Sequence, residues 1–430
     1  MTGVPSTYAV VTFGCRVNQA DSLAIEAKCQ GAGAVAAPVE SADLVVINSC
    51  SVTATADQGT RQMVRRVARL NPSAQIVVTG CYASRAPEDV VALAPGVTVV
   101  PNPRKREPLL EGSRLRVLST SDLGEGDRPG VIAPGLGGRT AYTVRIQTGC
   151  NEPCSYCIIP TTRGTPASQP GASVLAELAR AWDAGYEEVV IAGVHLGAWG
   201  RDLDGRPPLV SLLEDIEASA LAHNAAEPPR VRISSLEPMD CTPALIRLLA
   251  RSRVFAPHLH LPLQHASDRV LAAMRRPYRR AQFQALVDAV REALPHAAIG
   301  TDLITGFPGE RDDDAAMLEA YVETSPLTHL HVFPYSDRPD TPASRLGHRV
   351  PGGEVRARSQ RLRDIGAQLQ RRFLSSQVGT VHRALTVDDG SLAVTGNYLK
   401  VRIPPGLPRN VWTRVRITAV TPNVTGRLEP

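Results

Sequence analysis

Three cysteines, Cys150, Cys154 and Cys157, form a C-x3-C-x2-C cluster on one short segment of the chain. Three thiolates on a single loop can hold three irons of a 4Fe-4S cluster, which leaves the fourth iron open to a small molecule. Zinc motifs usually supply cysteines in pairs and complete a tetrahedron with two further ligands, whereas here an Ile-Ile-Pro run follows directly. The spacing therefore favours an iron–sulfur site; a partial zinc site and three structural thiols are the alternatives.

A second set of cysteines occupies equivalent positions in the first part of the chain. Cys15, Cys50 and Cys81 each lie about two residues beyond a short apolar run of a length that suits a buried parallel strand. Open α/β sheets bind their ligands at the carboxyl ends of such strands. We expect the three thiols to converge as a second three-cysteine cluster, and three buried structural cysteines are the alternative. The runs are Tyr8–Phe13, Leu44–Asn48 and Gln75–Thr79.

Helical patterns separate these strands. Asp21–Gly31 and Ala56–Leu70 have helical spacing, and we expect Asp21 and Thr55 to cap them. Alternating strands and helices predict a doubly wound α/β domain over residues 7–115. The glycine-rich residues 116–139 are typical of a linker.

Residues 140–370 repeat a strand followed by a helix. Six such units predict an open, partial (β/α)6 barrel whose first strand leads into the loop of Cys150. An incomplete barrel has a lateral opening wide enough for a macromolecular substrate. The expected strands are 142–147, 188–192, 230–234, 258–262, 298–304 and 327–333, and the expected helices are 173–184, 209–218, 243–249, 267–274, 280–294 and 313–323.

Residues 374–430 read as a third unit, with short strands and no helix between them. The strands expected at 381–387, 392–395, 398–403 and 414–420 predict a small antiparallel β-barrel. Residues 371–430 hold nine Lys or Arg against three acidic residues, a local charge of +6 that exceeds the +5 of the whole chain. Concentrated positive charge on a small β-barrel favours nucleic-acid binding, and a solvated basic surface without a ligand is the alternative.

Composition limits the function classes. The chain has 430 residues, enough for two or three domains, and no stretch approaches the ~20 apolar residues that span a membrane. The N-terminal residues have no secretion signal pattern. We therefore expect a cytoplasmic protein, in which eight cysteines favour metal sites over disulfides. Cys29 and Cys241 lie outside both sets and are expected to be ordinary apolar residues.

The segment CNEPCSYC at residues 150–157, with the aromatic Tyr156 before its last cysteine, resembles the signature of the radical S-adenosylmethionine enzymes. All three units in this order resemble the methylthiotransferases, which have an N-terminal cluster domain, a radical S-adenosylmethionine barrel and a C-terminal TRAM domain. The resemblance covers nearly the whole chain. It is carried by TFGCRVNQ at 12–19, NSC at 48–50, TGC at 79–81, CSYCIIP at 154–160, RG at 163–164, TD at 301–302, GFPGE at 306–310 and HVFPYS at 331–336.

This resemblance implies two 4Fe-4S clusters and S-adenosylmethionine as both radical source and methyl donor. Cys150, Cys154 and Cys157 would serve the radical step, and Cys15, Cys50 and Cys81 would hold the cluster for sulfur. Radical chemistry suits adenine C2, because its hydrogen is too weakly acidic for a general base. Partners would be a tRNA anticodon stem-loop and an electron donor such as flavodoxin or ferredoxin, with no membrane, and the protein would act as a monomer.

Loops after the barrel strands supply the expected cofactor contacts, because barrel chemistry occurs at the carboxyl ends of strands. Gly193, Glu237 and Gln264 lie in three such loops, and with Tyr156 they are the candidate S-adenosylmethionine contacts. Glu237 and Gln264 are the polar groups best suited to ribose or methionyl hydrogen bonds. His195 and His265, singly, are more typical of hydrogen-bonded scaffold.

Within the family, GCRVNQ at 14–19, SVTA at 51–54 and GVHLG at 193–197 look most like the enzymes that act on N6-threonylcarbamoyladenosine at tRNA position 37. Enzymes acting on isopentenyladenosine usually have a Gln-Met-Asn run where this chain has Arg16-Val17-Asn18. A ribosomal-protein aspartate is a third substrate in the family and fits the basic C-terminal unit less well. A non-catalytic iron–sulfur RNA-binding protein is the alternative from another class. Such a protein would have no use for the predicted barrel with its cofactor loops, so the pattern favours an enzyme.

Overall fold

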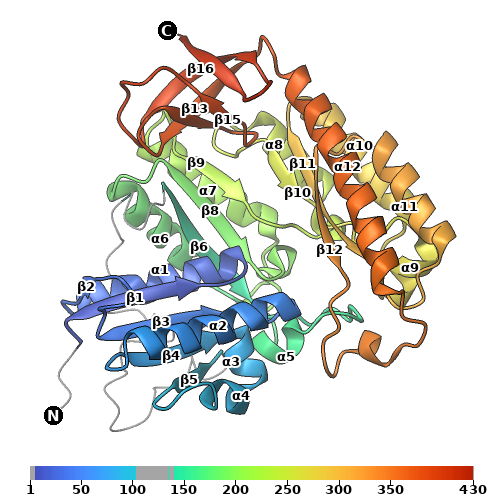
Figure 1. Ribbon diagram of the computed structural model, residues 1–430. Helices are drawn as coiled ribbons and strands as arrows, with labels where there is room; N and C mark the ends of the chain where they lie inside the picture. The colour runs from blue at the N-terminus through green and yellow to red at the C-terminus, as the bar shows by residue number, and fades with distance from the viewer. Residues whose placement is uncertain (1–4, 103–133, 135–139, 430) are drawn as a thin grey trace.

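Apolar, β-branched runs build the first sheet. In the computed structural model, which describes residues 5–102, 134 and 140–429, five parallel strands lie in the order β2-β1-β3-β4-β5 (Figure 1). The expected linker, residues 116–139, falls largely outside the described residues. The strands are β1 (Thr7–Thr12), β2 (Val35–Ala36), β3 (Leu44–Ser49), β4 (Gln75–Gly80) and β5 (Thr98–Pro101).

Helices cover both faces of this sheet, which confirms the doubly wound architecture. Apolar side chains of α1 pack on one face, and those of α2, α3 and α4 pack on the other. The helix-start predictions were wrong. Thr53 caps α2, since its hydroxyl accepts a hydrogen bond from the amide of Ala56 at 3.2 Å. Asp21 lies inside α1, where its carboxylate is buried against another domain. The helices are α1 (Arg16–Gly31), α2 (Ala54–Leu70), α3 (Cys81–Arg85) and α4 (Pro87–Val91).

Six parallel strands form the predicted open barrel. The order β6-β8-β9 continues through isolated parallel bridges, such as Ser235 to His260, into β10-β11-β12. The short strand β7 (Ala167–Ser168) pairs antiparallel with β6 at the outer edge. The barrel strands are β6 (Ala141–Thr148), β8 (Glu188–Gly193), β9 (Arg230–Ile233), β10 (His258–His260), β11 (Ala298–Thr305) and β12 (His329–Pro334).

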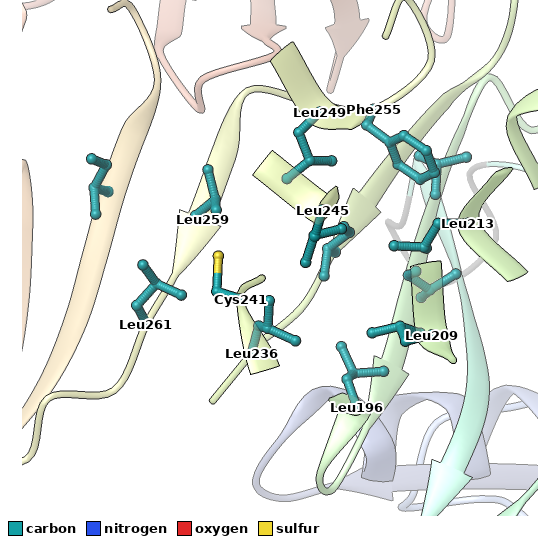
Figure 2. Packing of buried hydrophobic residues seen from close by; sticks show 14 of the residues in the cluster. Leu196, Leu209, Leu213, Leu236, Cys241, Leu245, Leu249, Phe255, Leu259 and Leu261 are labelled. Atoms are coloured by element: carbon teal, nitrogen blue, oxygen red, sulfur yellow. The ribbon is translucent and has the colours of Figure 1, made fainter. Parts of the chain in front are cut away.

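Outer helices bury the apolar backs of these strands in one extended core. Figure 2 shows part of it, where leucines from several elements surround Phe255 and the thiol of Cys241. Cys29 is buried in the core of the first domain, so both leftover cysteines are apolar packing residues. The helices are α5 (Ile159–Arg163), α6 (Gly171–Asp183), α7 (Leu209–His223), α8 (Pro243–Arg251), α9 (Asp268–Ala273), α10 (Arg280–Ala293) and α11 (Asp312–Thr324), with short 3-10 turns η4 (Leu196–Ala198), η5 (Pro238–Asp240) and η6 (Pro342–Arg345).

A long helix, α12 (Gly352–Ser376), was missed by the sequence reasoning. It packs along β12, the last strand of the barrel, with Gly366 against the side chain of Leu330 (Figure 1). Only four of its residues are fully buried, including Leu362 and Leu369. So narrow an apolar stripe gives a weak helical signal in a highly charged segment. The helix also runs past residue 370, the end that we expected for the barrel unit.

The C-terminal unit is a closed five-stranded barrel, with strand order β13-β14-β15-β17-β16. The expectation of an antiparallel barrel holds except where β15 meets β17 in parallel, and β17 had no counterpart in the sequence reasoning. Across the described residues, no helix combines the length and apolar character that crossing a bilayer requires. The strands are β13 (Val381–Val387), β14 (Leu392–Thr395), β15 (Lys400–Arg402), β16 (Trp412–Ala419) and β17 (Thr425–Glu429).

Candidate active site

Cysteines follow the carboxyl ends of four strands, and three of them come directly after a glycine. Gly14, Gly80 and Gly149 have φ of 97°, 93° and 73°, values that favour glycine. Space is also lacking for a side chain: a Cβ on Gly149 would lie 2.0 Å from the carbonyl oxygen of Thr165, and one on Gly14 would lie 2.7 Å from the Cβ of Cys50. These glycines turn the chain sharply, so that the cysteines lie directly at the carboxyl ends of the strands.

The loop of Cys150, Cys154 and Cys157 is held from several sides. The amide of Cys150 donates to the carbonyl of Gly164 at 3.1 Å, and the amide of Cys157 donates to the carbonyl of Cys154 at 3.2 Å. Buried Ser155 anchors the middle of the loop through its amide, hydroxyl and carbonyl, which bond to Met274, Ala273 and Ala343. The three thiols are therefore presented by a fixed backbone.

Charged side chains stand beside two of these sulfurs. Nδ1 of His195 lies 3.9 Å from Sγ of Cys150, and its Nε2 lies 2.7 Å from Asp240. Burial opposes the charged imidazole, but hydrogen bonds with Asp240 and Cys150 raise the pKa of His195 to about 10. Arg276, whose side chain is 2% exposed, donates to Sγ of Cys154 at 3.2 Å. Two cations thus face the sulfurs of this triad.

The four predicted cofactor contacts differ in how they are connected to this loop. Glu237 forms an ion pair with Arg276, which links it to Cys154. Gly193 is paired in register with Gln147 beside the start of the loop. Tyr156 packs in a small apolar cluster that includes Met274 and Phe307.

Gln264 is attached through its backbone to β11. Its backbone has a φ of 69°, and its described hydrogen bonds join it to β11, not to the cysteines. The structure thus shows contacts that place Glu237, Gly193 and Tyr156 beside the cysteine loop, and for Gln264 it shows backbone contacts with β11.

Cys15, Cys50 and Cys81 follow β1, β3 and β4, which are neighbours in the sheet. Cys15 is exposed, whereas the other two thiols are buried. Arg163 of α5 reaches into this group from the barrel, and interactions with Cys81, Asp21 and Cys15 raise its pKa against the effect of burial. A buried cation that comes six residues after Cys157 in the chain therefore lies beside the triad of the first domain.

Both triads fit anionic iron–sulfur clusters. The Nε of Arg163 is buried and has no hydrogen-bond partner among the described atoms, which suits a donor to an anionic cluster. Burial raises the pKa of the Cys50 and Cys157 thiols to about 12, so iron binding must release their protons. A single tetrahedral zinc would require the three sulfurs of a triad to lie within 4.8 Å of one another, and neither triad meets this requirement. Among the described residues, the group whose potential ligand atoms lie that close together is His260, Asp302 and His331.

A cavity of about 1000 Å³ opens along the incomplete side of the barrel. Cys15 and Arg16 line it from the first domain, Tyr398 lines it from the C-terminal barrel, and residues of β8 to β12 and α12 form the rest. The cavity therefore touches all three units and reaches the exposed cysteine of the first triad. This position suits a large substrate that inserts one group between the units.

Four histidines line the cavity wall as two pairs, each with one histidine from β10 and one from β12; the pair nearer the start of the strands is called the lower layer and the other the upper layer. His258 and His329 form the lower layer, where Gly300 leaves room for them: a Cβ at Gly300 would lie 2.1 Å from Nε2 of His329. His260 and His331 form the upper layer on either side of Asp302, with nitrogens 3.0 and 3.1 Å from its Oδ1. Burial raises the pKa of Asp302, but these hydrogen bonds overcome it and lower the pKa to about 2. Hydrogen bonds to an ionised carboxylate thus account for the closeness of these three groups.

Comparisons with known proteins agree with this geometry. The model of the Radical SAM superfamily matches residues 144–321, and that of the uncharacterized protein family UPF0004 matches residues 7–101. The threonylcarbamoyladenosine tRNA methylthiotransferase MtaB of Bacillus subtilis is 33% identical over 92% of this chain and 90% of its own length. The chain belongs to the radical S-adenosylmethionine methylthiotransferase family. As a family member it is an enzyme that uses S-adenosylmethionine and a 4Fe-4S cluster.

Other relatives of this methylthiotransferase carry two different names. The MtaB protein of Chlamydia pneumoniae is 34% identical over 93% of this chain and 92% of its own length. The tRNA-2-methylthio-N(6)-dimethylallyladenosine synthase of Paenarthrobacter aurescens is 35% identical over 88% of this chain but 74% of its own length. The solved structure of the radical S-adenosylmethionine methyltransferase TsrM from Kitasatospora setae, with cobalamin and a 4Fe-4S cluster, has a TM-score of 0.54 at 14% identity, covering 79% of this chain and 77% of that one. This last likeness concerns the fold.

Sequence reasoning missed three charged residues of the methylthiotransferase site: Arg276, Asp240 and the bridging role of Arg163. Arg276 lies more than a hundred positions after Cys154, in an arginine-rich stretch that reads as solvated surface. A Pro-Met-Asp turn that fixes Asp240 likewise has no catalytic signature. Their placement depends on the closure of the barrel, so spacing along the chain carried no signal for them.

Proposed function

We propose that this methylthiotransferase converts N6-threonylcarbamoyladenosine at position 37 of tRNA to its 2-methylthio derivative. The observation that carries the proposal is the near full-length match to two proteins named MtaB, which the chain covers to 90% and 92% of their length. The relatives named dimethylallyladenosine synthases are covered to about three quarters of theirs. The match in length supports the threonylcarbamoyl substrate over the dimethylallyl one.

The proposed division of labour follows the two triads. Cys150, Cys154 and Cys157 would hold one 4Fe-4S cluster, and Cys15, Cys50 and Cys81 would hold a second. When bound, the clusters and S-adenosylmethionine supply a deoxyadenosyl radical, the sulfur and its methyl group.

The side chains around the triads would neutralise the negative charge of the clusters and orient S-adenosylmethionine. Arg276 and His195 offset negative charge at the barrel loop, while Arg163 does so at the triad of the first domain. Glu237, Gly193, Tyr156 and, with less support from its position, Gln264 are the proposed S-adenosylmethionine contacts.

Binding of the RNA would use the cavity and the C-terminal barrel. The anticodon stem-loop would insert its modified adenosine through the lateral opening, toward Cys15. Exposed cations on the C-terminal barrel, at Lys400, Arg402 and Arg414, would hold the phosphates. Some of the +6 charge is otherwise engaged, since Arg416 and Arg427 pair with Glu429. We further place the enzyme in the cytoplasm as a monomer served by a flavodoxin or ferredoxin.

Mass spectrometry of nucleosides from tRNA of cells lacking this gene tests the function. Loss of 2-methylthio-N6-threonylcarbamoyladenosine, with accumulation of the unthiolated nucleoside, is the expected result. Loss of the 2-methylthio-isopentenyl nucleoside instead would assign the alternative substrate. An unchanged nucleoside profile would exclude both and leave the ribosomal-protein aspartate as the substrate to examine.

A further inference from the structure

The cavity beside the barrel carries more positive than negative charge. Asp302 is the single carboxylate among its lining residues, and its Oδ1 already accepts hydrogen bonds from two histidines. Arg363 also lines the cavity, and in the described part of the chain it forms neither a hydrogen bond nor an ion pair. An exposed guanidinium at the wall of an electropositive cavity is a receptor for an anion.

Arg363 and the cysteines stand on opposite sides of the opening. The helix α1, which begins directly after Cys15, packs against β6, the first strand of the barrel, and Cys150 follows β6 itself. On the other side, α12 packs against β12, the last strand (Figure 1). A group in the cavity therefore has the loop of Cys15 on one side and α12 on the other.

The substrate adenosine carries on N6 a group whose charge is opposite to that of Arg363. Its reacting C2 and the C6 that carries N6 flank N1 in the same ring, and their exocyclic bonds point in different directions, so an adenosine that turns C2 to Cys15 directs its N6 substituent to another part of the cavity wall. The threonylcarbamoyl group on N6 ends in a carboxylate, whereas a dimethylallyl group is apolar. The chemistry of this substituent thus calls for a cation on the cavity wall, and Arg363 is such a cation without a partner among the described residues.

His331 on β12 lines the same cavity and supplies a second donor. Its Nδ1 is 3.1 Å from Asp302, while its side chain remains 52% exposed, so the Nε2 position is left for a ligand. The hydrogen bond with Asp302 raises the pKa of His331, which favours the form that donates from both nitrogens. A guanidinium fork and an imidazole N–H together can satisfy both oxygens of a carboxylate.

We propose that Arg363 and His331 form a subsite that binds the carboxylate of the threonylcarbamoyl group and so selects this substrate over N6-alkylated adenosines. This subsite rests on the proposed function. The competing role for Arg363 is a contact to an RNA phosphate, which would strengthen binding of any tRNA to the same degree. The two roles differ in one property, namely whether Arg363 senses the charge of the N6 substituent.

The test compares two anticodon stem-loops that differ in one charge. One carries N6-threonylcarbamoyladenosine, and the other carries its threonine methyl ester, which is neutral and similar in length. Dissociation constants are measured for the enzyme with both clusters loaded. The natural acid is expected to bind about ten- to a hundredfold more tightly than the ester, the usual range for a hydrogen bond to a charged group.

Arg363→Gln is expected to bring the acid-to-ester ratio close to one by weakening the acid alone, and His331→Asn is expected to lower the ratio in part. Arg356→Gln is the matched control: Arg356 lies seven residues earlier on α12, is exposed and does not line the cavity, so its loss should leave the ratio unchanged. Because Arg363 is exposed and unpaired, its replacement removes no contact that holds the fold.

A wild-type ratio near one would overturn the subsite, and so would an Arg363→Gln variant that loses acid and ester binding equally. Failure of the proposed function is separate, because it appears as missing methylthio product from the acid RNA even though the binding ratio holds. Product formation with a ratio of one would keep the function and refute the subsite.

Discussion

Arg163 of the barrel forms a buried ion pair with Asp21 of the first domain, with Nη2 3.3 Å from Oδ2. Arg163 comes six residues after Cys157, and Asp21 comes six residues after Cys15, so this pair joins the segments that carry the two triads. Arg145 of β6 shares the same carboxylate. The pairing holds the two proposed cluster sites in a fixed relation, as sulfur insertion at a radical centre requires.

Replacing Arg163 by Met should lower the reduction potential of the first-domain cluster. A buried positive charge beside Cys81 stabilises the reduced, more negative cluster, and its removal disfavours electron uptake. Potentiometric titration followed by electron paramagnetic resonance measures the shift. Arg145→Met is the control, because Arg145 shares Asp21 without being among the charges that act on Cys50. Equal potentials in wild type and Arg163→Met would contradict the assignment.

Iron content should divide between the two triads. Anaerobically reconstituted protein should bind about eight irons, and replacement of Cys150, Cys154 and Cys157 by Ala should leave about four. That variant should no longer cleave S-adenosylmethionine. Iron analysis and quantification of 5′-deoxyadenosine check both outcomes. Retention of all eight irons would show that these thiols are not the ligands.

The first triad should be dispensable for radical formation. A variant with Cys15, Cys50 and Cys81 replaced by Ala should still produce 5′-deoxyadenosine, since its barrel loop is unchanged, but should give no methylthio product. Chromatography of the reaction on a modified stem-loop measures the two products together. Cys29→Ala, at a core position, serves as the control and should retain both activities. Normal methylthiolation by the triple variant would refute a second cluster.

Glu188 should make the stability of the barrel depend on acid pH. Burial raises its pKa, but Arg230 and Arg232 overcome this and lower the pKa to about 2 from an ordinary 4.5. Because the folded pKa is depressed, the stabilisation is present above pH 4.5 and is lost as the pH falls from 4.5 through 2. Glu188→Gln should cost about 3–5 kcal/mol at pH 7, since it leaves two buried arginines without their partner.

Urea unfolding of wild type and Glu188→Gln at several pH values measures this dependence, and the difference between them should shrink below pH 4.5. Glu187→Gln is the control, because an amide oxygen can still accept the hydrogen bond from the indole of Trp412. A difference that stays constant from pH 7 to pH 3 would contradict the role of Glu188.

The C-terminal barrel should bind tRNA through phosphates. Charge reversal at Lys400, Arg402 and Arg414 should weaken binding of different tRNAs to a similar degree and reduce the salt dependence of the affinity, by about one counterion per lost contact. Filter binding at two salt concentrations gives both quantities. Arg251→Glu, on the outer helix α8, tests for a general charge effect. An unchanged salt slope in the triple variant would assign the barrel another role, such as docking a protein.

The sequence by itself determined the order of units and the loops that carry the cysteines. Apolar β-branched runs specify buried parallel strands locally, and a cysteine two residues later must stand at a strand end. The positive φ values of Gly14, Gly80 and Gly149, each directly before a cysteine, are likewise local. These features need no knowledge of distant parts of the chain.

Only the tertiary structure decided which charges face the sulfurs and which cations remain free. Arg163, Arg276 and Arg363 look alike in the sequence, yet the first is buried between two domains, the second touches Cys154 and the third is left exposed at the cavity wall. A guanidinium takes its role from the carboxylates and thiols that folding brings near it. Those partners lie in other domains or on other strands, so chain spacing carries no trace of them.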